Sequence, residues 1–274
     1  MRGLFNNCRT GVAIALVLLA ACSGGSESAS SDARPQRGAA MVAAAQPALC
    51  EAETVLSAEP ADSAEPLTAM ELQARLIVDT APKPEGFRSQ TVIVDQGLGS
   101  FRIATPTTFS AFWRNGTPAD ELTELAQARD EAWTDYWGGQ IESGDVETRA
   151  ISIDGGRQDA LVAVLITLTE APEQTGDSLA RAFAQRYGSG GVPIGESCGV
   201  RANGADGAYV EHTIPRSMIG GGTDRTQLQF LIPDRANNAL WGVTCDVPKA
   251  LASDVKARCV EIAATFQPLP PIEG

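Results

Sequence analysis

Aromatic residues are confined to one part of this chain, and their distribution limits where a packed core can form. The sequence has 15 aromatic residues, and only Phe5 precedes Phe87. The other 14 lie between Phe87 and Phe266. Aromatic side chains supply much of the apolar surface that a core buries. We therefore expect one globular domain over 87–268, followed by a short tail at 269–274.

The overall composition excludes two classes of protein. Hydrophobic residues make up 43% of the 274 residues and charged residues 20%, which is enough apolar material for a core and argues against general disorder. The formal net charge is −13 and the isoelectric point is near 4.5. Binding to nucleic acid through a general basic surface needs clustered Lys and Arg, so we expect no nucleic-acid partner.

The N-terminus has the pattern of an export signal. Arg2 and Arg9 precede the uncharged, mainly apolar run Gly11–Leu19. Such a run of about nine residues is too short for a membrane span, which needs about 20 helical residues. A basic start followed by a short apolar run predicts a secretory signal peptide over residues 1–21.

The end of this signal peptide carries a more specific motif. Leu19-Ala20-Ala21-Cys22, followed by Ser23, resembles the lipobox of bacterial lipoproteins. The resemblance implies that Cys22 is lipidated and becomes the mature N-terminus, and that acyl chains anchor the protein to a membrane. Ser23 resembles the pattern that sends lipoproteins to the outer membrane in a host that has one; otherwise we expect the outer face of the cytoplasmic membrane. The alternative is an ordinary secretory signal whose cleavage site lies near Cys22.

Removal of residues 1–21 makes the chain more acidic. It takes away two Arg and no acid, which leaves 19 basic against 34 acidic residues and a net charge of −15. Acidity disfavours adsorption to anionic lipid headgroups. Attachment to a membrane would therefore rest on the acyl chains, each buried CH2 of which contributes about 0.8 kcal/mol.

Two segments separate the anchor from the aromatic core. Residues 22–49 are rich in Ser, Gly and Ala with scattered charge, so we expect a disordered, flexible tether. Residues 50–86 are predicted to form a helical preface, because Thr68–Glu71 fits a capping box. Apolar residues close to helical spacing follow it: Met70, Leu72, Leu76 and Ile77.

Within 87–268 the patterns predict short strands, several of them joined by hairpins. Turn signals at Gln96–Gly99 and Asp154–Arg157 each lie between two runs of strand-forming residues. The run Leu161–Leu168 is continuously apolar, so we expect its strand to be central and covered on both faces. The predicted strands are 91–95, 100–104, 148–154, 160–168, 208–214, 226–232 and 240–247.

Three helices are expected among these strands. The first is predicted to begin at Thr117 and to stop at Gly138-Gly139, and the others to span 176–187 and 249–266. Strands that meet mostly through hairpins, with helices between some pairs, predict an α+β fold with a mostly antiparallel sheet flanked by helices.

Part of this pattern resembles a known fold family. The segment Phe101-Arg102-Ile103-Ala104-Thr105-Pro106 and the closing strand–helix pair look like the PsbP-like α/β/α sandwich. That family includes many secreted bacterial lipoproteins. The resemblance implies the fold and carries over no catalytic residue.

Four cysteines remain once Cys8 leaves with the signal peptide and Cys22 takes lipid. These four are Cys50, Cys198, Cys245 and Cys259. In an oxidising compartment they allow three disulfide pairings. Strand alternation places Cys245 on the face shared with Trp241, and Cys259 lies in the apolar stripe of the last helix. We therefore favour Cys245–Cys259, which leaves Cys50–Cys198. A single disulfide, free thiols or a metal site are the alternatives, and without a CxxC pair we expect no metal.

One motif raises the alternative of a serine hydrolase. Gly195–Gly199 matches G-x-S-x-G, with Ser197 as nucleophile, His212 as base and Asp206 as its orienting acid. That chemistry needs a helix after the motif, whereas residues 201–204 predict a turn. The acid and the histidine also follow unusually soon. We interpret the motif as a Gly-rich loop that carries a disulfide cysteine, and we expect no catalytic residue.

Signals for cofactors and metals are weak. His212 is the only histidine, which excludes a His-pair metal site, and its strand pattern predicts a buried structural side chain. Gly220-Gly221-Gly222 lacks both the spacing of a phosphate-binding loop and a following Lys. Three aspartates fit no EF-hand register: Asp145, Asp154 and Asp159. We expect neither a cofactor nor a metal.

The leading interpretation is a membrane-anchored envelope lipoprotein with a non-enzymatic binding or scaffolding role. Its expected contacts are the membrane, through the N-terminal lipid, and an envelope protein partner. The alternative outside catalysis is a binding module for a small apolar or carbohydrate ligand. Trp133, Tyr136 and Trp137 are predicted to lie in the core, and they become the first ligand-binding candidates if they are exposed.

Overall fold

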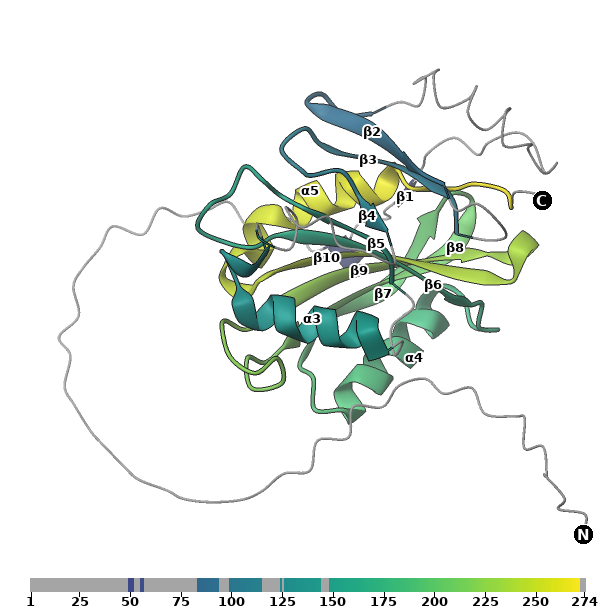
Figure 1. The fold of residues 1–274 in the computed structure, drawn as a ribbon. Helices are drawn as coiled ribbons and strands as arrows, with labels where there is room; N and C mark the ends of the chain where they lie inside the picture. The colour runs from purple at the N-terminus through teal and green to yellow at the C-terminus, as the bar shows by residue number, and fades with distance from the viewer. Residues whose placement is uncertain are drawn as a thin grey trace, which may run out of the picture.

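The chain forms two antiparallel sheets with helices packed between and outside them (Figure 1). The computed structural model describes residues 49–51, 55–56, 83–93, 99–114, 124, 126–143 and 148–271. Within these residues strands and helices alternate irregularly, and neighbouring strands mostly run antiparallel. The predicted α+β class is confirmed.

The larger sheet has eight strands in the order β1-β7-β8-β9-β10-β6-β5-β4. Among the described pairs only β1 and β7 run parallel. The strand β6, which holds most of the continuous apolar run, is interior and buried on both faces over most of its length. The bounds are β1 Val55–Leu56, β4 Trp113–Arg114, β5 Thr148–Ile153, β6 Ala163–Glu170, β7 Ile194–Ala202, β8 Ala205–Ile214, β9 Arg225–Asp234 and β10 Ala239–Pro248.

The smaller sheet has three strands, and its aromatic side chains join it to the rest of the core. Its order is β11-β3-β2, with bounds β2 Phe87–Val92, β3 Phe101–Pro106 and β11 Gln267–Pro268. The ring of Phe101 lies 5.9 Å from that of Trp241 in β10 and 5.6 Å from that of Phe266. One apolar cluster therefore spans both sheets.

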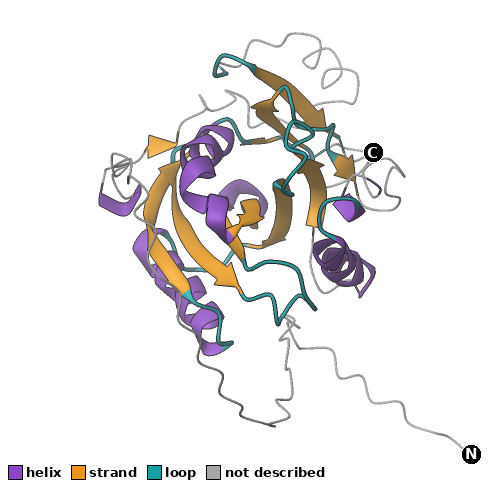
Figure 2. Cartoon of the chain, turned by 90° about the vertical axis from the view of Figure 1, so that its left-hand side faces the viewer, coloured by secondary structure: helices purple, strands orange, loops and turns teal. Residues whose placement is uncertain are grey.

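The helices cover both faces of the larger sheet. Helix α5 (Ala252–Ala264) lies inside its curve, while α3 (Glu131–Ser143) and α4 (Gly176–Ser189) lie outside (Figure 2). The described residues also form three short 3-10 turns: η1 Leu49–Glu51, η2 Arg235–Asn237 and η3 Lys249–Leu251. Among the described residues, none of the helices is both long and apolar enough to cross a membrane.

Helix α3 does not match the single helix that the sequence predicted from Thr117 to Gly138-Gly139. The chain turns at Arg129, and the Asp130 carboxylate accepts a hydrogen bond from the Trp133 amide at 3.1 Å, which begins a new helix. That helix continues through Gly138 to Ser143, so the predicted stop at Gly138-Gly139 is wrong. A mid-helix glycine costs only about 1 kcal/mol, and burial of neighbouring tryptophans outweighs it. The predicted start at Thr117 lies outside the described residues.

Strand β7 replaces the loop that the sequence predicted at Gly195–Gly199. A Cβ on Gly199 would lie 2.7 Å from the Asp177 amide nitrogen at the start of α4. The Gly199 amide donates to Asp177 Oδ1 at 2.6 Å. This glycine is therefore a point of close approach between a strand and a helix, and the loop interpretation is wrong.

The segment before the domain is described only in part. Within the preface expected over 50–86, the structure shows the 3-10 turn Leu49–Glu51 and the strand β1. The signal peptide, the tether as far as residue 48 and the helix expected after Thr68 lie outside the described residues.

Two disulfides are present, and they are the two pairs that the sequence favoured. Cys50–Cys198 joins η1 to β7 with a Cα–Cα distance of 5.6 Å. Cys245–Cys259 joins β10 to α5 with a Cα–Cα distance of 6.1 Å. The second bond is buried in the main apolar cluster and holds α5 against the sheet.

A glycine substitution tests the packing of β8 on β9. A Cβ on Gly207 would lie 2.4 Å from the Leu231 carbonyl oxygen, which belongs to backbone and cannot rotate away. We expect Gly207→Ala to lower the free energy of unfolding in urea by about 1–3 kcal/mol.

The matched control for this substitution is Gly188→Ala in α4. There the new Cβ meets only Ile194 Cγ1, at 3.8 Å. Alanine favours the helix, so stability should be unchanged or higher by up to about 1 kcal/mol. Equal stability of Gly207→Ala and the wild type would contradict the described strand contact.

Candidate functional site

The outer face of the larger sheet carries polar side chains where apolar ones would be expected. Arg225, Gln227 and Gln229 alternate along β9, His212 lies opposite Gln227 on β8, and Asp246 lies opposite Gln227 on β10. All five side chains are buried. Buried polar groups are costly unless they are hydrogen-bonded, so their pairing determines what this face can do.

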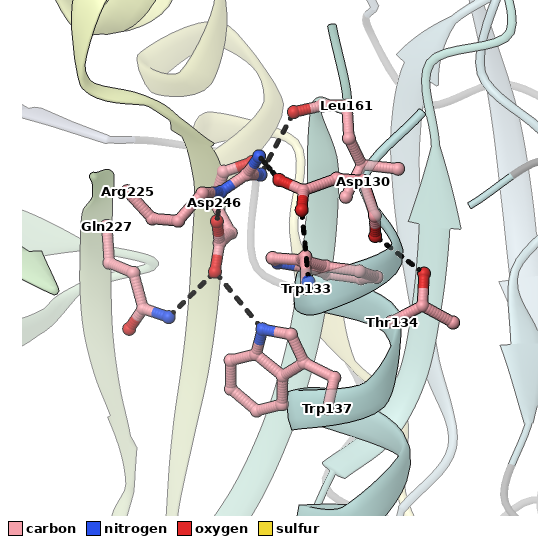
Figure 3. Close-up of polar contacts among 8 residues, drawn as sticks. All are labelled: Asp130, Trp133, Thr134, Trp137, Leu161, Arg225, Gln227 and Asp246. Atoms are coloured by element: carbon pink, nitrogen blue, oxygen red, sulfur yellow. Dashed lines mark hydrogen bonds and ion pairs between the residues drawn. The ribbon is translucent and has the colours of Figure 1, made fainter. Parts of the chain in front are cut away.

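The Arg225 guanidinium is the centre of this group. Its Nε donates to Asp246 Oδ1 at 2.7 Å, and its Nη1 donates to Asp130 Oδ2 at 3.3 Å (Figure 3). Its Nη2 donates to the carbonyl oxygens of Leu161 and Asp246 at 2.9 and 3.0 Å. Side-chain exposure is 1% for both Arg225 and Asp246. One cation is thus held between two carboxylates from different elements.

The second oxygen of Asp246 connects the sheet to α3. Asp246 Oδ2 accepts hydrogen bonds from Gln227 Nε2 at 2.9 Å and from Trp137 Nε1 at 3.3 Å (Figure 3). The guanidinium carbon of Arg225 lies 5.8 Å from the centre of the Trp133 ring. We call the following residues the buried charge network: Arg225, Asp246, Gln227, Asp130, Trp133 and Trp137.

The two tryptophans of α3 lie against the charged residues of the buried charge network. Trp133 is 3% exposed and Trp137 is 9% exposed, so they anchor the helix and do not form an open platform for a ligand. Tyr136 is half-buried, and its pKa is raised by burial and by the Asp246 charge. The tryptophans are core residues, as the sequence predicted.

His212 lies between the sheet and α4. Its ring stacks on that of Tyr187 with a centroid distance of 4.0 Å, and the Tyr187 hydroxyl donates to Gln229 Oε1 at 3.0 Å. Burial lowers the pKa of His212 to about 4, against the raising effects of a hydrogen bond to Gln227 and the charge of Asp246. Its Nδ1 has no hydrogen-bond partner among the described residues. The imidazole is therefore neutral at physiological pH.

The three residues of the hydrolase alternative do not form a catalytic triad. Ser197 lies within β7, opposite Val210, and not at a turn between a strand and a helix. Asp206 and His212 are six residues apart in the same strand, which separates them by about 20 Å. This acid cannot orient that imidazole, so the geometry does not support the hydrolase alternative.

A second charged group lies on the inner face. Lys256 of α5 donates to Glu196 at 2.7 Å and to Glu211 at 3.0 Å, and the Tyr209 hydroxyl donates to Glu211 at 3.0 Å. Burial lowers the pKa of Lys256, but the hydrogen bonds to both glutamates raise it above its ordinary value. Burial, followed by the Glu211 charge, raises the pKa of Tyr209. Lys256 and Tyr209 therefore keep their protons at neutral pH, and the two ion pairs of Lys256 hold α5 on β7 and β8.

Metal ligation has no support in the described part of the chain, where no group of three His, Cys, Asp or Glu is placed to hold an ion. Asp154 instead accepts the Gly156 amide at 3.0 Å within the β5–β6 turn. Asp159 joins no such group, and Asp145 lies outside the described residues.

The buried charge network was not predicted from the sequence, although the sequence contains a signal for it. Arg225, Gln227 and Gln229 alternate in a run that the hydrophobic pattern assigns to a strand, and Asp246 lies at the end of another such run. Charged residues in buried strands need partners. The sequence gives no means to choose those partners, because the nearest lies 21 residues away and another 95.

Comparisons with known proteins add distant structural similarities. No protein-family model and no curated protein matches the chain. The solution structure of cyanobacterial PsbP (CyanoP) from Synechocystis sp. PCC 6803 is 11% identical, with a TM-score of 0.41, over 68% of this chain and 94% of that one. LpqN, involved in cell envelope biogenesis of Mycobacterium tuberculosis, is 9% identical, with a TM-score of 0.39, over 75% and 99%.

A Bacteroides thetaiotaomicron protein is 13% identical, with a TM-score of 0.34, over 61% of this chain and 44% of that one. All three TM-scores are below 0.5. The similarities therefore assign neither a family nor a function, and the PsbP-like sandwich stays a prediction.

Removal of one charge tests the buried charge network. Asp246→Asn leaves the Arg225 guanidinium buried without its nearest counter-charge, so we expect the free energy of unfolding to fall by about 3–5 kcal/mol. The measurement is urea unfolding followed by tryptophan fluorescence. Glu261→Gln is the control, because the Arg258–Glu261 pair is about half exposed on both sides and should change stability by less than about 0.5 kcal/mol. Similar losses in both variants would show that the network is not stabilising.

His212 predicts a specific dependence of stability on pH. The unfolded chain takes up this proton near pH 6.5, whereas the folded chain does so only near pH 4. Stability should therefore fall by up to about 3 kcal/mol as the pH drops between these values. In His212→Gln this part of the slope should vanish, while the contribution of the carboxylates remains. Parallel stability curves for the two proteins between pH 7.5 and 4 would contradict the assignment.

Proposed function

We propose that this protein is a membrane-anchored envelope lipoprotein whose α+β domain binds or scaffolds another envelope component without catalysing a reaction. The observation that carries the proposal is the disulfide between Cys50 and Cys198. Disulfides persist in oxidising compartments outside the cytoplasm, where the predicted signal peptide would deliver the chain.

The position of this disulfide suits an anchored domain. The predicted tether ends at residue 49, and the next residue is bonded to Cys198 within β7, a strand of the larger sheet. Strand β1 adds only two residue pairs to the same strand. A force on the lipidated N-terminus would therefore be transmitted to the sheet through the covalent Cys50–Cys198 bond. The bond closes a long loop and should contribute about 2–4 kcal/mol to stability.

The attachment itself is assigned to Cys22, which lies outside the described residues. Its acyl chains would hold an acidic mature protein that has little attraction for anionic headgroups. Ser23 favours the outer membrane in a host with two membranes and the outer face of the cytoplasmic membrane otherwise.

A non-enzymatic role is supported by the arrangement of the side chains that could otherwise take part in catalysis. Ser197, His212 and Asp206 are too poorly arranged to act together, and both carboxylate oxygens of Asp246 are bound by Arg225 and Gln227. The alternative of an aromatic ligand site is not favoured either, because Trp133 and Trp137 are buried beneath their own helix.

One experiment tests anchoring and partnership together. Cells that express the full chain are grown with labelled palmitate and treated with a mild crosslinker. The wild type should incorporate the label and become crosslinked to an envelope protein, whereas Cys22→Ala should incorporate none. Cys8→Ala is the control, because this cysteine leaves with the signal peptide and its loss should not affect labelling.

The two parts of the proposal can fail separately. Equal labelling of Cys22→Ala and the wild type would overturn the lipid anchor. Labelling without any crosslinked envelope protein would overturn the scaffolding role.

A further inference from the structure

The turn between β8 and β9 has a backbone that few sequences can form. Gly220, Gly221 and Gly222 have φ values of 81°, 146° and 69°, a region that side chains rarely adopt. In the sequence this turn lacks the Lys that follows a phosphate-binding loop. The fold supplies cations from elsewhere, because Arg216 and Lys249 line the same open depression as Gly222.

Asp224 holds these two cationic residues on either side of the depression. Its Oδ1 accepts a hydrogen bond from the Arg216 amide at 3.0 Å, and its carbonyl oxygen accepts one from the Lys249 amide at 2.8 Å. Arg216 follows β8 and Lys249 follows β10. The backbone therefore brings together two residues that are far apart in the sequence.

The charged ends of the Arg216 and Lys249 side chains are accessible to a ligand. Arg216 and Lys249 are both exposed, and neither side chain has a hydrogen bond or an ion pair with the part of the chain that the structure describes. Of the residues that line the depression, only Asp224 is acidic, and one of its carboxylate oxygens already accepts an amide. The lining thus carries two positive side chains and one negative, and the carboxylate of Asp130 beside Gly222 is paired with Arg225 at 3.3 Å.

We propose that this depression binds a phosphate group. A guanidinium offers a planar pair of donors that fits phosphate oxygens, and an ammonium adds a compact positive charge. Thr223 adds an exposed hydroxyl. The Asp130 carboxylate lies on the Cβ side of Gly222, so the phosphate would be held by the side chains of Arg216, Lys249 and Thr223. The phosphate would belong either to a soluble compound or to a phospholipid headgroup. The site does not depend on the lipid anchor or on the scaffolding role.

Calorimetric titration of the purified full chain in a non-ionic detergent tests this site. Inorganic phosphate and glycerophosphoglycerol, the soluble headgroup of phosphatidylglycerol, are the two probes. At least one should bind saturably with one site per chain. In the double variant Arg216→Ala/Lys249→Ala its association constant should fall about tenfold or more, because hydrogen bonds to a charged group are lost.

A charge-matched variant separates a site from general electrostatics. Arg181→Ala/Arg186→Ala removes two exposed cations from α4 and changes the net charge equally. Its association constants should stay within about twofold of the wild type, since screening weakens distant charges. Binding of the headgroup would identify a lipid source, and binding of inorganic phosphate alone a soluble one. The absence of saturable binding by either probe, or equal weakening in both double variants, would overturn the proposal.

Discussion

The ion pair between Arg225 and Asp246 is the interaction on which the outer half of the structure depends. Removing two charges from water costs several kcal/mol each, and only a complete set of hydrogen bonds offsets that cost. The Arg225 guanidinium makes four such bonds, to Asp246 Oδ1, the carbonyl oxygens of Asp246 and Leu161, and Asp130 Oδ2, while Gln227 donates to the second carboxylate oxygen of Asp246. A shift of β9 by one residue would turn its polar side chains into the apolar interior, so the pair also specifies strand register.

The two faces of the larger sheet consequently have different roles. The inner face holds α5 through apolar packing around Trp241 and Phe266 and through the Cys245–Cys259 bond. The outer face holds α3 through the buried charge network and through an apolar cluster that packs Trp133 and Trp137 on β5 and β6. It holds α4 through a second apolar cluster with the stacked pair of Tyr187 and His212. The position of α3 therefore depends on polar and apolar contacts together.

This division also determines where the protein can interact. Most buried polar groups of the outer face bind one another, although the Trp133 indole N–H and His212 Nδ1 have no partner among the described residues. The surface features that remain lie where strands end or where the chain enters the domain. One is the pair Arg216 and Lys249 beside the glycine turn, and the other is the Cys50–Cys198 bond next to the predicted tether.

Local patterns in the sequence determined a large part of this fold. Alternation and helical spacing identified most strands, both later helices and the antiparallel class, because these signals depend on residues a few positions apart. The aromatic distribution indicated a core from Phe87 onward, but β1 also joins the larger sheet, and Leu49 and Cys50 pack against its apolar cluster. The same periodicities favoured the Cys245–Cys259 pairing, since they put both cysteines on facing surfaces.

Only the tertiary structure decided the features that join distant residues. Gly199 belongs to a strand because it pairs with Ala208 of β8, and the approach of α4 leaves no room there for a side chain. Asp130 precedes the first residue of α3, and its carboxylate also binds Arg225, which lies 95 residues away. Lys249 reaches the glycine turn through Asp224. A sequence specifies such contacts only through the register of whole strands, so they cannot be seen in any short stretch of it.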